Sequence, residues 1–284
     1  MSRHPRRATA QETVAILERG EYRAPSGRAV PIASAVDRSV RDTVLYDPDR
    51  LAAHLKTIAA AEPGGLATRV EVTGETTLEA ARRLSAPTGD GVVPLALNFA
   101  SAKNPGGGFL NGAHAQEEGL ARSSALYASL RSARAFYDFH REQRDLLYSD
   151  HMIYSPAVPV FRDDAGRLLE EPYQVAFLTS PAPNRGAIRD PGKAALIPDT
   201  LRLRARKVLA AALVNGHARL VLGAWGCGVF RNDPREVATA FAEALGPGAQ
   251  FAGRFEHVVF AVWDNAKGSP RLTAFQEVFA GLAG

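Results

Sequence analysis

From residue 67 onward, short apolar segments alternate with longer segments of helical composition. Because strands that alternate with helices build layered α/β domains, this order predicts an α/β fold with a mixed sheet. We expect strands near 67–72, 92–98, 151–160, 174–179, 219–223 and 257–263, and helices near 77–84, 116–130, 201–214, 234–245 and 271–280.

The residues before this alternation are less regular. Thr9-Ala-Gln-Glu12 has the pattern of a capping box, and the apolar turn that follows it stops at Gly20. Pro63-Gly-Gly65 marks a break in the chain. We therefore expect residues 1–65 to form an N-terminal helical extension packed on a main domain at 66–284.

Composition excludes a membrane protein and a disordered one. Hydrophobic residues make up 46% of the chain and charged residues 23%, which is near the average of globular proteins. The longest apolar runs, such as 209–214 and 258–262, are far shorter than the ~20 residues of a membrane span. We expect a protein with no membrane partner.

A single cysteine, Cys227, excludes an internal disulfide and a cysteine-rich zinc site. The basic N-terminal residues 1–10 lack the apolar core of a secretory signal, so we expect a cytoplasmic protein. The acidic pairs at 163–164 and 170–171 lack the ligand spacing of a calcium loop. We expect no metal and no cofactor.

The charge of the chain suits an acidic polymer as its partner. The formal net charge is +4, and basic surface raises the rate of encounter with polyanions. An arginine-rich solvated surface explains the same charge without any partner. A direct nucleic-acid role is not expected, because the arginines are scattered rather than clustered with interleaved aromatic residues.

The segment 98–118 has the composition of a ligand site. Three consecutive glycines, Gly106, Gly107 and Gly108, leave a loop without side chains, so its backbone can adopt positive φ and approach a ligand closely. Gln116-Glu117-Glu118 then opens a segment that is rich in Ala and Leu. This places an amide and a carboxylate pair at the start of a helix, next to the glycine loop.

Helical geometry limits what the two carboxylates can do. Adjacent helical residues point about 100° apart, so Glu117 and Glu118 cannot both face one bond in the same way. Most glycosidases use two carboxyls that flank the scissile bond, and this motif does not supply that pair. One carboxyl therefore performs the chemistry and the other orients the substrate.

A second glycine-rich element, Gly223-Ala-Trp-Gly-Cys-Gly-Val-Phe230, directly follows an apolar strand. The next helix starts near Asn232-Asp-Pro234, which combines an Asx cap with proline in the first turn. Such loops bind anions through backbone amides, although a simple tight strand-to-helix turn would look the same. The Gly-x-Gly-x-x-Gly fingerprint of dinucleotide-binding proteins is absent from the sequence.

Four further residues have ordinary structural explanations. His114 lies in a loop with no partner spaced to make it a base, and Cys227 fills a glycine-rich turn with no nearby histidine to activate it. Trp225 and Trp263 end apolar strands, where core packing is the usual role. The sequence does not identify an aromatic slot for a base.

A triple glycine a few residues ahead of Gln-Glu-Glu resembles the signature of the poly(ADP-ribose) glycohydrolase family. Two sequence segments are similar to the shorter bacterial branch of this family. They are Asn-Phe-Ala-Ser-Ala-Lys-Asn-Pro-Gly-Gly-Gly-Phe-Leu-Asn-Gly-Ala, from Asn98, and Gln-Glu-Glu-Gly-Leu-Ala-Arg-Ser-Ser-Ala-Leu-Tyr, from Gln116. The resemblance extends from about Asp42 to the C-terminus. It implies a macrodomain-like fold, with a mixed sheet sandwiched between helices.

The resemblance also implies roles for individual residues. Glu118 would give its proton to the 2′ oxygen of the leaving adenosine ribose, which leaves an oxocarbenium-like distal ribose, and would then take a proton from water. This requires a pKa above the usual ~4.3 of glutamate. Glu117 would hold a substrate hydroxyl, and Gln116 would fix the local geometry. The residues implied in substrate binding are Asn98, Ser101, Asn104, Gly106, Gly107, Gly108, Gln116, Gly223, Gly226, Cys227, Gly228, Val229 and Phe230.

Within that set, the second loop would cradle the ADP-ribose diphosphate, with Phe230 against the distal ribose. Asn98 and Ser101 stand where the animal branch has an aspartate and an asparagine, which leaves open how the distal ribose and the glycine loop are held. Asn104 is a candidate to replace the missing amide.

The implied function is hydrolysis of the ribose–ribose O-glycosidic bonds of poly(ADP-ribose), end-directed as the bacterial resemblance favours, with release of ADP-ribose. The implied partners are poly(ADP-ribose), ADP-ribose and poly(ADP-ribosyl)ated proteins, and we expect a monomer. An ADP-ribose-binding reader or a mono-ADP-ribosyl hydrolase is the alternative. Gln-Glu-Glu favours the enzyme over a reader, since a reader needs a phosphate loop but no positioned carboxylate.

Overall fold

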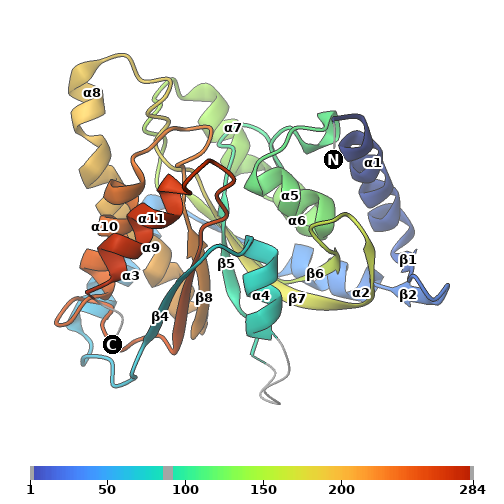
Figure 1. Cartoon of the computed structure of the whole chain (residues 1–284), viewed down its shortest axis with the longest axis horizontal. Helices are drawn as coiled ribbons and strands as arrows, with labels where there is room; N and C mark the ends of the chain where they lie inside the picture. Colours follow the sequence, from blue (N-terminus) through green and yellow to red (C-terminus); the bar gives the residue numbers. More distant parts are fainter. Residues whose placement is uncertain (1–2, 86–91, 282–284) are drawn as a thin grey trace.

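The computed structural model describes residues 3–85 and 92–281. Its centre is a seven-stranded mixed sheet with the strand order β3-β6-β7-β5-β8-β9-β4 (Figure 1). β3, β6 and β7 pair antiparallel, whereas β7, β5, β8, β9 and β4 run parallel. The strands of this sheet are β3 (Val44–Tyr46), β4 (Arg69–Thr73), β5 (Leu95–Phe99), β6 (Met152–Arg162), β7 (Leu168–Ser180), β8 (Arg219–Gly223) and β9 (His257–Ala261).

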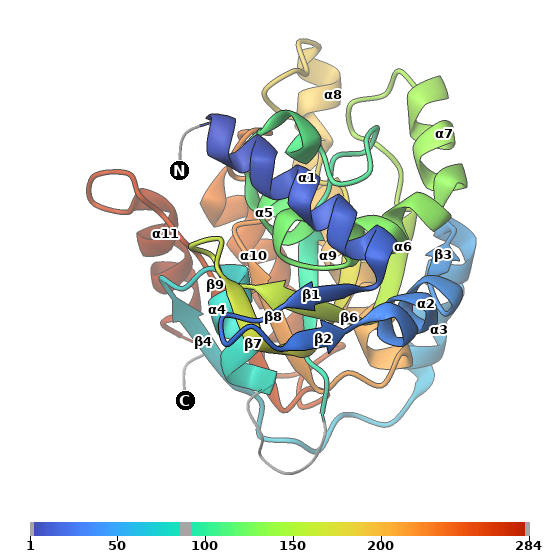
Figure 2. The same ribbon diagram turned by 90° about the vertical axis from the view of Figure 1, so that its right-hand side faces the viewer.

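Helices cover both faces of the sheet, and Figures 1 and 2 show the two groups on opposite sides. The first group is α3 (Pro48–Ala60), α8 (Pro191–Ala195), α9 (Ile197–Val214), α10 (Pro234–Leu245) and α11 (Pro270–Phe279). The second group is α1 (Arg3–Arg19), α2 (Ala33–Arg41), α4 (Thr77–Ser85), α5 (Gln116–Ser123), α6 (Leu126–Ser132) and α7 (Arg134–Glu142). The predicted α/β fold, a mixed sheet between helices, is confirmed.

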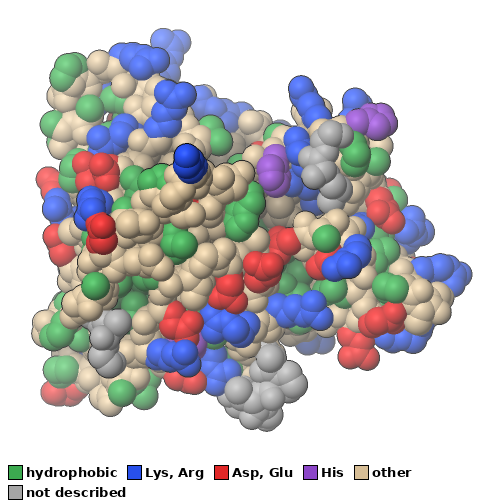
Figure 3. Space-filling view, viewed as in Figure 1, with side chains coloured by type: hydrophobic (Ala, Val, Ile, Leu, Met, Phe, Trp, Pro, Cys, Tyr) green, Lys and Arg blue, Asp and Glu red, His purple; other side chains and the backbone are tan. Residues whose placement is uncertain are grey.

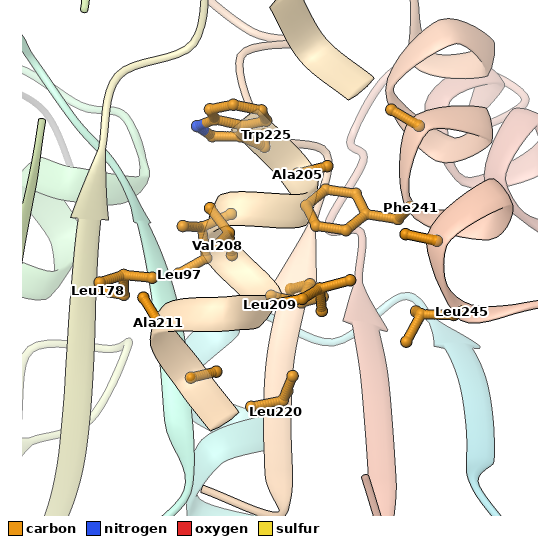
Figure 4. Packing of buried hydrophobic residues seen from close by; sticks show 14 of the residues in the cluster. Leu97, Leu178, Ala205, Val208, Leu209, Ala211, Leu220, Trp225, Phe241 and Leu245 are labelled. Carbon is orange, nitrogen blue, oxygen red and sulfur yellow. The ribbon is translucent and has the colours of Figure 1, made fainter. Parts of the chain in front are cut away.

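The two faces of the sheet carry separate hydrophobic cores. Leu95 and Leu97 of β5 belong to the core under α9 and α10, and Ala96 between them belongs to the core on the other face. This follows from the two-residue period of a strand. Figure 4 shows Leu97 of β5 against Val208 of α9, with the aromatic ring of Trp225 packed beside them. Trp225 is fully buried, as predicted.

The predicted helix at 116–130 is wrong in one respect, because it is two helices. Ser124 separates α5 from α6 with an extended backbone, at φ −145° and ψ 175°. It forms an isolated antiparallel bridge with Val160 of β6. The long-range bridge to the sheet outweighs the local helical propensity of the Ala- and Leu-rich segment. α7 was not predicted.

The N-terminal segment was predicted to be a helical extension packed on the main domain, but it also forms part of the central sheet. β3 lies inside this segment and pairs with β6, so residues before 65 supply an edge strand. A small antiparallel sheet of β1 (Glu21–Arg23) and β2 (Ala29–Pro31) follows α1. The capping box at Thr9 was wrong, because α1 already begins at Arg3 and the Thr9 hydroxyl donates to Pro5 O within it.

In the part of the chain that the structure describes, no helix has the length and apolarity to cross a bilayer. The feature that matters for function is the edge where the parallel strands end. β5 and β8 are neighbours, so the segments that leave their carboxyl ends start side by side. Ligands of parallel α/β sheets bind at this edge.

Candidate active site

The triple glycine lies in the loop between β5 and a short 3-10 helix, η1 (Phe109–Asn111). Gly106 and Gly107 have φ values of +70° and +60°, a region that L-residues rarely adopt. A Cβ atom on Gly107 would overlap with Glu118 Oε1. The glycines therefore allow the loop backbone to lie directly against the carboxyl pair of α5.

Glu117 is buried beneath this loop, with 3% of its surface exposed. Its Oε2 accepts a hydrogen bond from Ser101 N at 2.7 Å, and its Oε1 accepts one from Asn98 Nδ2 at 3.3 Å. Burial raises the pKa of Glu117 to about 8; the Ser101 and Asn98 hydrogen bonds oppose this shift, and the charge of Glu118 adds to it. The surroundings of Glu117 therefore favour its protonated, neutral form.

Glu118 is partly exposed and points along the glycine loop. Its Oε1 accepts a hydrogen bond from Gly108 N at 2.9 Å, and the described residues supply no other hydrogen bond to its carboxyl. One carboxyl of the pair is thus locked in the interior, and the other keeps an oxygen available to a ligand. Glu117 and Glu118 are adjacent on α5, and adjacent helical side chains point about 100° apart, so one carboxyl points into the interior and the other does not.

The Gln116 amide ties the start of α5 to the end of β5. Its Oε1 accepts from Phe99 N at 2.9 Å, and its Nε2 donates to Leu97 O at 2.8 Å and to Thr77 Oγ1 at 3.1 Å. These three hydrogen bonds of the Gln116 amide are all made to other groups of the protein. Gln116 is therefore a positioning residue for the glutamates that follow it.

The polar residues at the end of β5 support the same pair. Asn98 Nδ2 also donates to Thr179 Oγ1 of β7 at 3.1 Å. Ser101 Oγ accepts from the backbone N–H groups of Lys103 and Asn104, at 3.4 and 3.2 Å. Asn104 O accepts from Gly107 N at 2.9 Å, so the described contacts of Asn104 are made by its main chain and its side chain is exposed.

The second glycine-rich loop leaves β8 beside this site. Gly223 at the end of β8 lies against Phe99 at the end of β5, since a Cβ atom on Gly223 would be 3.2 Å from the Phe99 ring. The two glycine-rich loops therefore start next to each other. Among the described residues, no protein acceptor meets the backbone N–H groups of Gly226, Gly228, Val229 and Phe230. Val229 is 76% exposed. Free N–H groups on an exposed turn form a site for an anion.

The helix that follows this loop is capped as the sequence predicted. Asp233 accepts hydrogen bonds from Arg235 N and Glu236 N, and Pro234 is the first residue of α10. Burial raises the pKa of the Cys227 thiol, so the sulfur stays protonated. A thiolate nucleophile at Cys227 is therefore not supported.

Several residues at the site were not singled out from the sequence. Tyr148 has a left-handed backbone, with φ +56°, and its ring centroid lies 5.8 Å from that of Phe230. Arg204, which is 1% exposed, donates to the carbonyls of Leu147 and Tyr148. Arg204 falls on the apolar face of α9, three residues after Leu201 and four before Val208, and this position was the available signal for the contact.

Trp263 is a correction, because 52% of its surface is exposed where core packing was predicted. It follows β9, whose Ala261 is paired with Gly223, and so lies at the edge that carries the second glycine loop. His114 is exposed and its Nδ1 lies 3.4 Å from Arg122 Nη2. Partial desolvation of its ring and the nearby Arg122 charge lower the pKa of His114.

The described residues contain no group of three or more His, Cys, Asp and Glu side chains that could hold a metal ion. One accessible carboxyl, one buried carboxyl and an anion-binding loop lie together at this edge of the sheet. These features define a glycohydrolase with a macrodomain-like fold.

Comparison with known proteins gives the family. Residues 10–163 match the model of the microbial-type PARG catalytic domain, where PARG is poly(ADP-ribose) glycohydrolase. This chain belongs to the microbial-type poly(ADP-ribose) glycohydrolases. No curated protein sequence matches it.

Solved structures of the family agree. The poly(ADP-ribose) glycohydrolase of Thermomonospora curvata is 66% identical, with a TM-score of 0.93 over 97% of this chain and 100% of that one. The same enzyme bound to the inhibitor ADP-HPD is 65% identical, with a TM-score of 0.90 over 96% and 99%. The Deinococcus radiodurans enzyme in complex with ADP-ribose is 46% identical, with a TM-score of 0.81 over 88% and 98%.

Proposed function

We propose that this glycohydrolase cleaves ribose–ribose O-glycosidic bonds of poly(ADP-ribose) with Glu118 as its single acid/base, and releases ADP-ribose. The observation that carries this assignment is the hydrogen bond from Gly108 N to Glu118 Oε1. It holds one carboxyl oxygen on the glycine loop and turns the other toward the ligand side. Glu118 gives its proton to the leaving 2′ oxygen and then takes one from the attacking water.

Glu117 has the complementary role. As a buried neutral acid it can donate its proton to a substrate hydroxyl next to the scissile bond, while Ser101 N and Asn98 hold its oxygens. When a substrate diphosphate binds nearby, its negative charge favours a further proton on the pair, which is the form that Glu118 needs.

The rest of the ligand follows the edge of the sheet. The unpaired N–H groups of the loop from Gly226 to Phe230 suit a diphosphate, and the Phe230 ring, backed by Tyr148, suits the distal ribose. The exposed indole of Trp263 offers an apolar surface for adenine at the same edge. The Deinococcus radiodurans relative, solved with ADP-ribose, supports this class of ligand.

We further propose that cleavage proceeds from chain ends. α1 crosses the rim of the site, where Arg3 Nε donates to Asn111 O at 3.1 Å and Arg6 Nε donates to Gly112 O at 2.9 Å. Thr13 Oγ1 of α1 also donates to Arg122 O of α5 at 2.6 Å. A helix held in this position leaves less space at the site for a poly(ADP-ribose) chain that continues beyond the bound unit in both directions.

The function is tested by incubating the protein with automodified, labelled poly(ADP-ribose). Loss of polymer with appearance of free ADP-ribose is the expected result, and sizing at short times should show no long free chains. Long free chains would show cleavage within the polymer and would contradict end-directed cleavage, without contradicting hydrolysis itself. Intact protein-bound polymer together with tight ADP-ribose binding would overturn the enzyme assignment in favour of a reader.

Removal of single ADP-ribose units from protein is the second candidate activity, and the same accessible Glu118 would serve it. A mono-ADP-ribosylated protein in the same assay separates the two. We also propose that residues 66–284 carry the catalytic residues as a unit, and that the enzyme acts as a cytoplasmic monomer on poly(ADP-ribosyl)ated proteins.

Gly107→Ala is expected to lower kcat/KM for poly(ADP-ribose) by about a hundredfold, since displacement of a catalytic group by about 1 Å has an effect of that order. The new Cβ overlaps with Glu118 Oε1, and the residue must hold φ +60°. Gly65→Ala is the control, because no atom lies within 4 Å of a Cβ there. Equal kcat/KM for both variants would show that the loop does not set the position of Glu118.

A further inference from the structure

A cavity of about 250 Å³ lies beside the glycine loop, outside the site described above. It is bounded by the loop after β5, by α6 and by α7, which Figure 2 shows together at one side of the site. Its wall on the loop is Pro105, the residue before Gly106. The lining residues are Pro105, Leu130, Arg131, Arg134, Tyr137 and Arg141.

The cavity is strongly basic. Three of its lining residues are arginines, and none is acidic. The single carboxylate of Asp138 holds two of them, Arg134 at 3.2 Å and Arg141 at 2.7 Å. Arg141 Nε also donates to Lys103 O at 3.0 Å, so the Lys103 backbone carbonyl joins this cluster. Positive charge exceeds negative charge in the lining, and the arginines are exposed to an incoming ion.

Tyr137 gives a second and independent indication of a ligand. The residue is 1% exposed, and among the described residues its hydroxyl has no hydrogen-bond partner. Burial raises the pKa of Tyr137 well above its ordinary value, so the hydroxyl remains a donor. A buried, unpaired O–H group costs free energy unless a ligand or water accepts its proton.

We propose that this cavity is a second anion site, which binds a diphosphate of the poly(ADP-ribose) chain outside the unit held in the catalytic cleft. Guanidinium groups and a phenolic donor are the groups that proteins use to bind phosphate oxygens. Each further unit of the polymer carries another diphosphate, and the cavity opens at the loop that contacts Glu118. The assignment rests on the proposed function, and inorganic phosphates share the same chemistry.

The cavity also lies beside the loop that contacts the catalytic pair, because its lining residue Pro105 directly precedes Gly106. Gly108 N of that loop donates to Glu118 Oε1 at 2.9 Å. A chain anchored in the cavity would therefore lie close to the acid pair. The site would favour polymer over a substrate that lacks a second diphosphate.

The test uses the full chain with Arg131→Gln and Arg134→Gln combined, and Tyr137→Phe separately. The control, Arg202→Gln with Arg206→Gln, makes the same charge change on exposed residues of α9. Two substrates are compared: poly(ADP-ribose), and ADP-ribose whose distal ribose carries a neutral phenolic leaving group. Binding of inorganic pyrophosphate is measured by calorimetry with ADP-ribose saturating the cleft.

For the arginine variant, we expect KM for the polymer to rise about fivefold to tenfold, as for loss of charge-assisted contacts. KM for the phenolic substrate should stay unchanged, and pyrophosphate binding should be lost. Tyr137→Phe should give a smaller rise of the same kind. Loss of pyrophosphate binding without any change in KM for the polymer overturns the polymer assignment, and no pyrophosphate binding to wild type overturns the site. Hydrolysis of neither substrate by wild type would instead refute the proposed function.

Discussion

Replacement of Glu118 by glutamine is expected to abolish hydrolysis of poly(ADP-ribose) and to leave ADP-ribose binding nearly unchanged. Glutamine keeps the shape of the side chain and an oxygen to accept from Gly108 N, so the glycine loop retains its place. It cannot transfer a proton to the leaving 2′ oxygen. Loss of a general acid lowers turnover by about 10² to 10⁴. The rate is measured in single turnover, and ADP-ribose affinity by calorimetry.

Glu117→Gln is the matched comparison, because the two glutamates are adjacent and the substitution is the same. The surroundings of Glu117 favour its neutral form, so a neutral amide changes the charge little and a smaller loss of turnover is expected. The reverse order, with Glu118→Gln active and Glu117→Gln inactive, would exchange the two roles. Similar residual rates in both variants would indicate that the pair shares one proton in the transition state.

The sequence is sufficient to predict most of the strands and helices after residue 66 and the place of the glutamates. Apolar segments of strand length at 219–223 and 257–263 correspond to β8 and β9, and Gln116 opens α5 as the helix signals indicate. These features are local, because they depend on periodicity and on capping residues. Asp233 and Pro234 at the start of α10 are predicted for the same reason.

The features that the sequence does not reveal depend on distant contacts. Ser124 interrupts a helical segment because it bridges to Val160 of β6. β3 is only three residues long and gains its place from pairing with β6. Local propensity carries no information about either partner.

The burial of the catalytic pair has the same origin. The sequence did not show which of the two glutamates lies in the interior, and the structure buries Glu117 under Ser101 and Asn98. Helical periodicity shows that the two side chains diverge, but not which of them turns toward the end of β5. That choice depends on how α5 docks, and Gln116 fixes it through Thr77 and the β5 backbone.

Arg204→Met is expected to destabilise the fold by about 3 to 5 kcal/mol, the range for breaking a buried ion pair from one side. Arg204 is 1% exposed, and its Nε donates to Asp150 Oδ1 at 2.7 Å. Its Nη1 donates to Leu147 O and to Pro181 O, at 3.0 and 2.7 Å. Methionine fills the volume but leaves these acceptors unpaired. Urea unfolding measures the free energy change.

The loss should reach the active site, because Arg204 also holds the carbonyl of Tyr148 at 3.2 Å. Tyr148 needs that support, since it keeps φ +56° while its ring backs Phe230. ADP-ribose affinity should therefore fall in Arg204→Met at temperatures where the variant is still folded. Arg206→Met, an exposed change two residues further along α9, should alter the free energy of unfolding by less than about 0.5 kcal/mol. If Arg204→Met were as stable as this control, the prediction would be wrong, because Asp150 and the three carbonyls would then have found other donors. Lys207 Nζ lies 2.7 Å from Asp150 Oδ2 and can replace Arg204 only at this carboxylate.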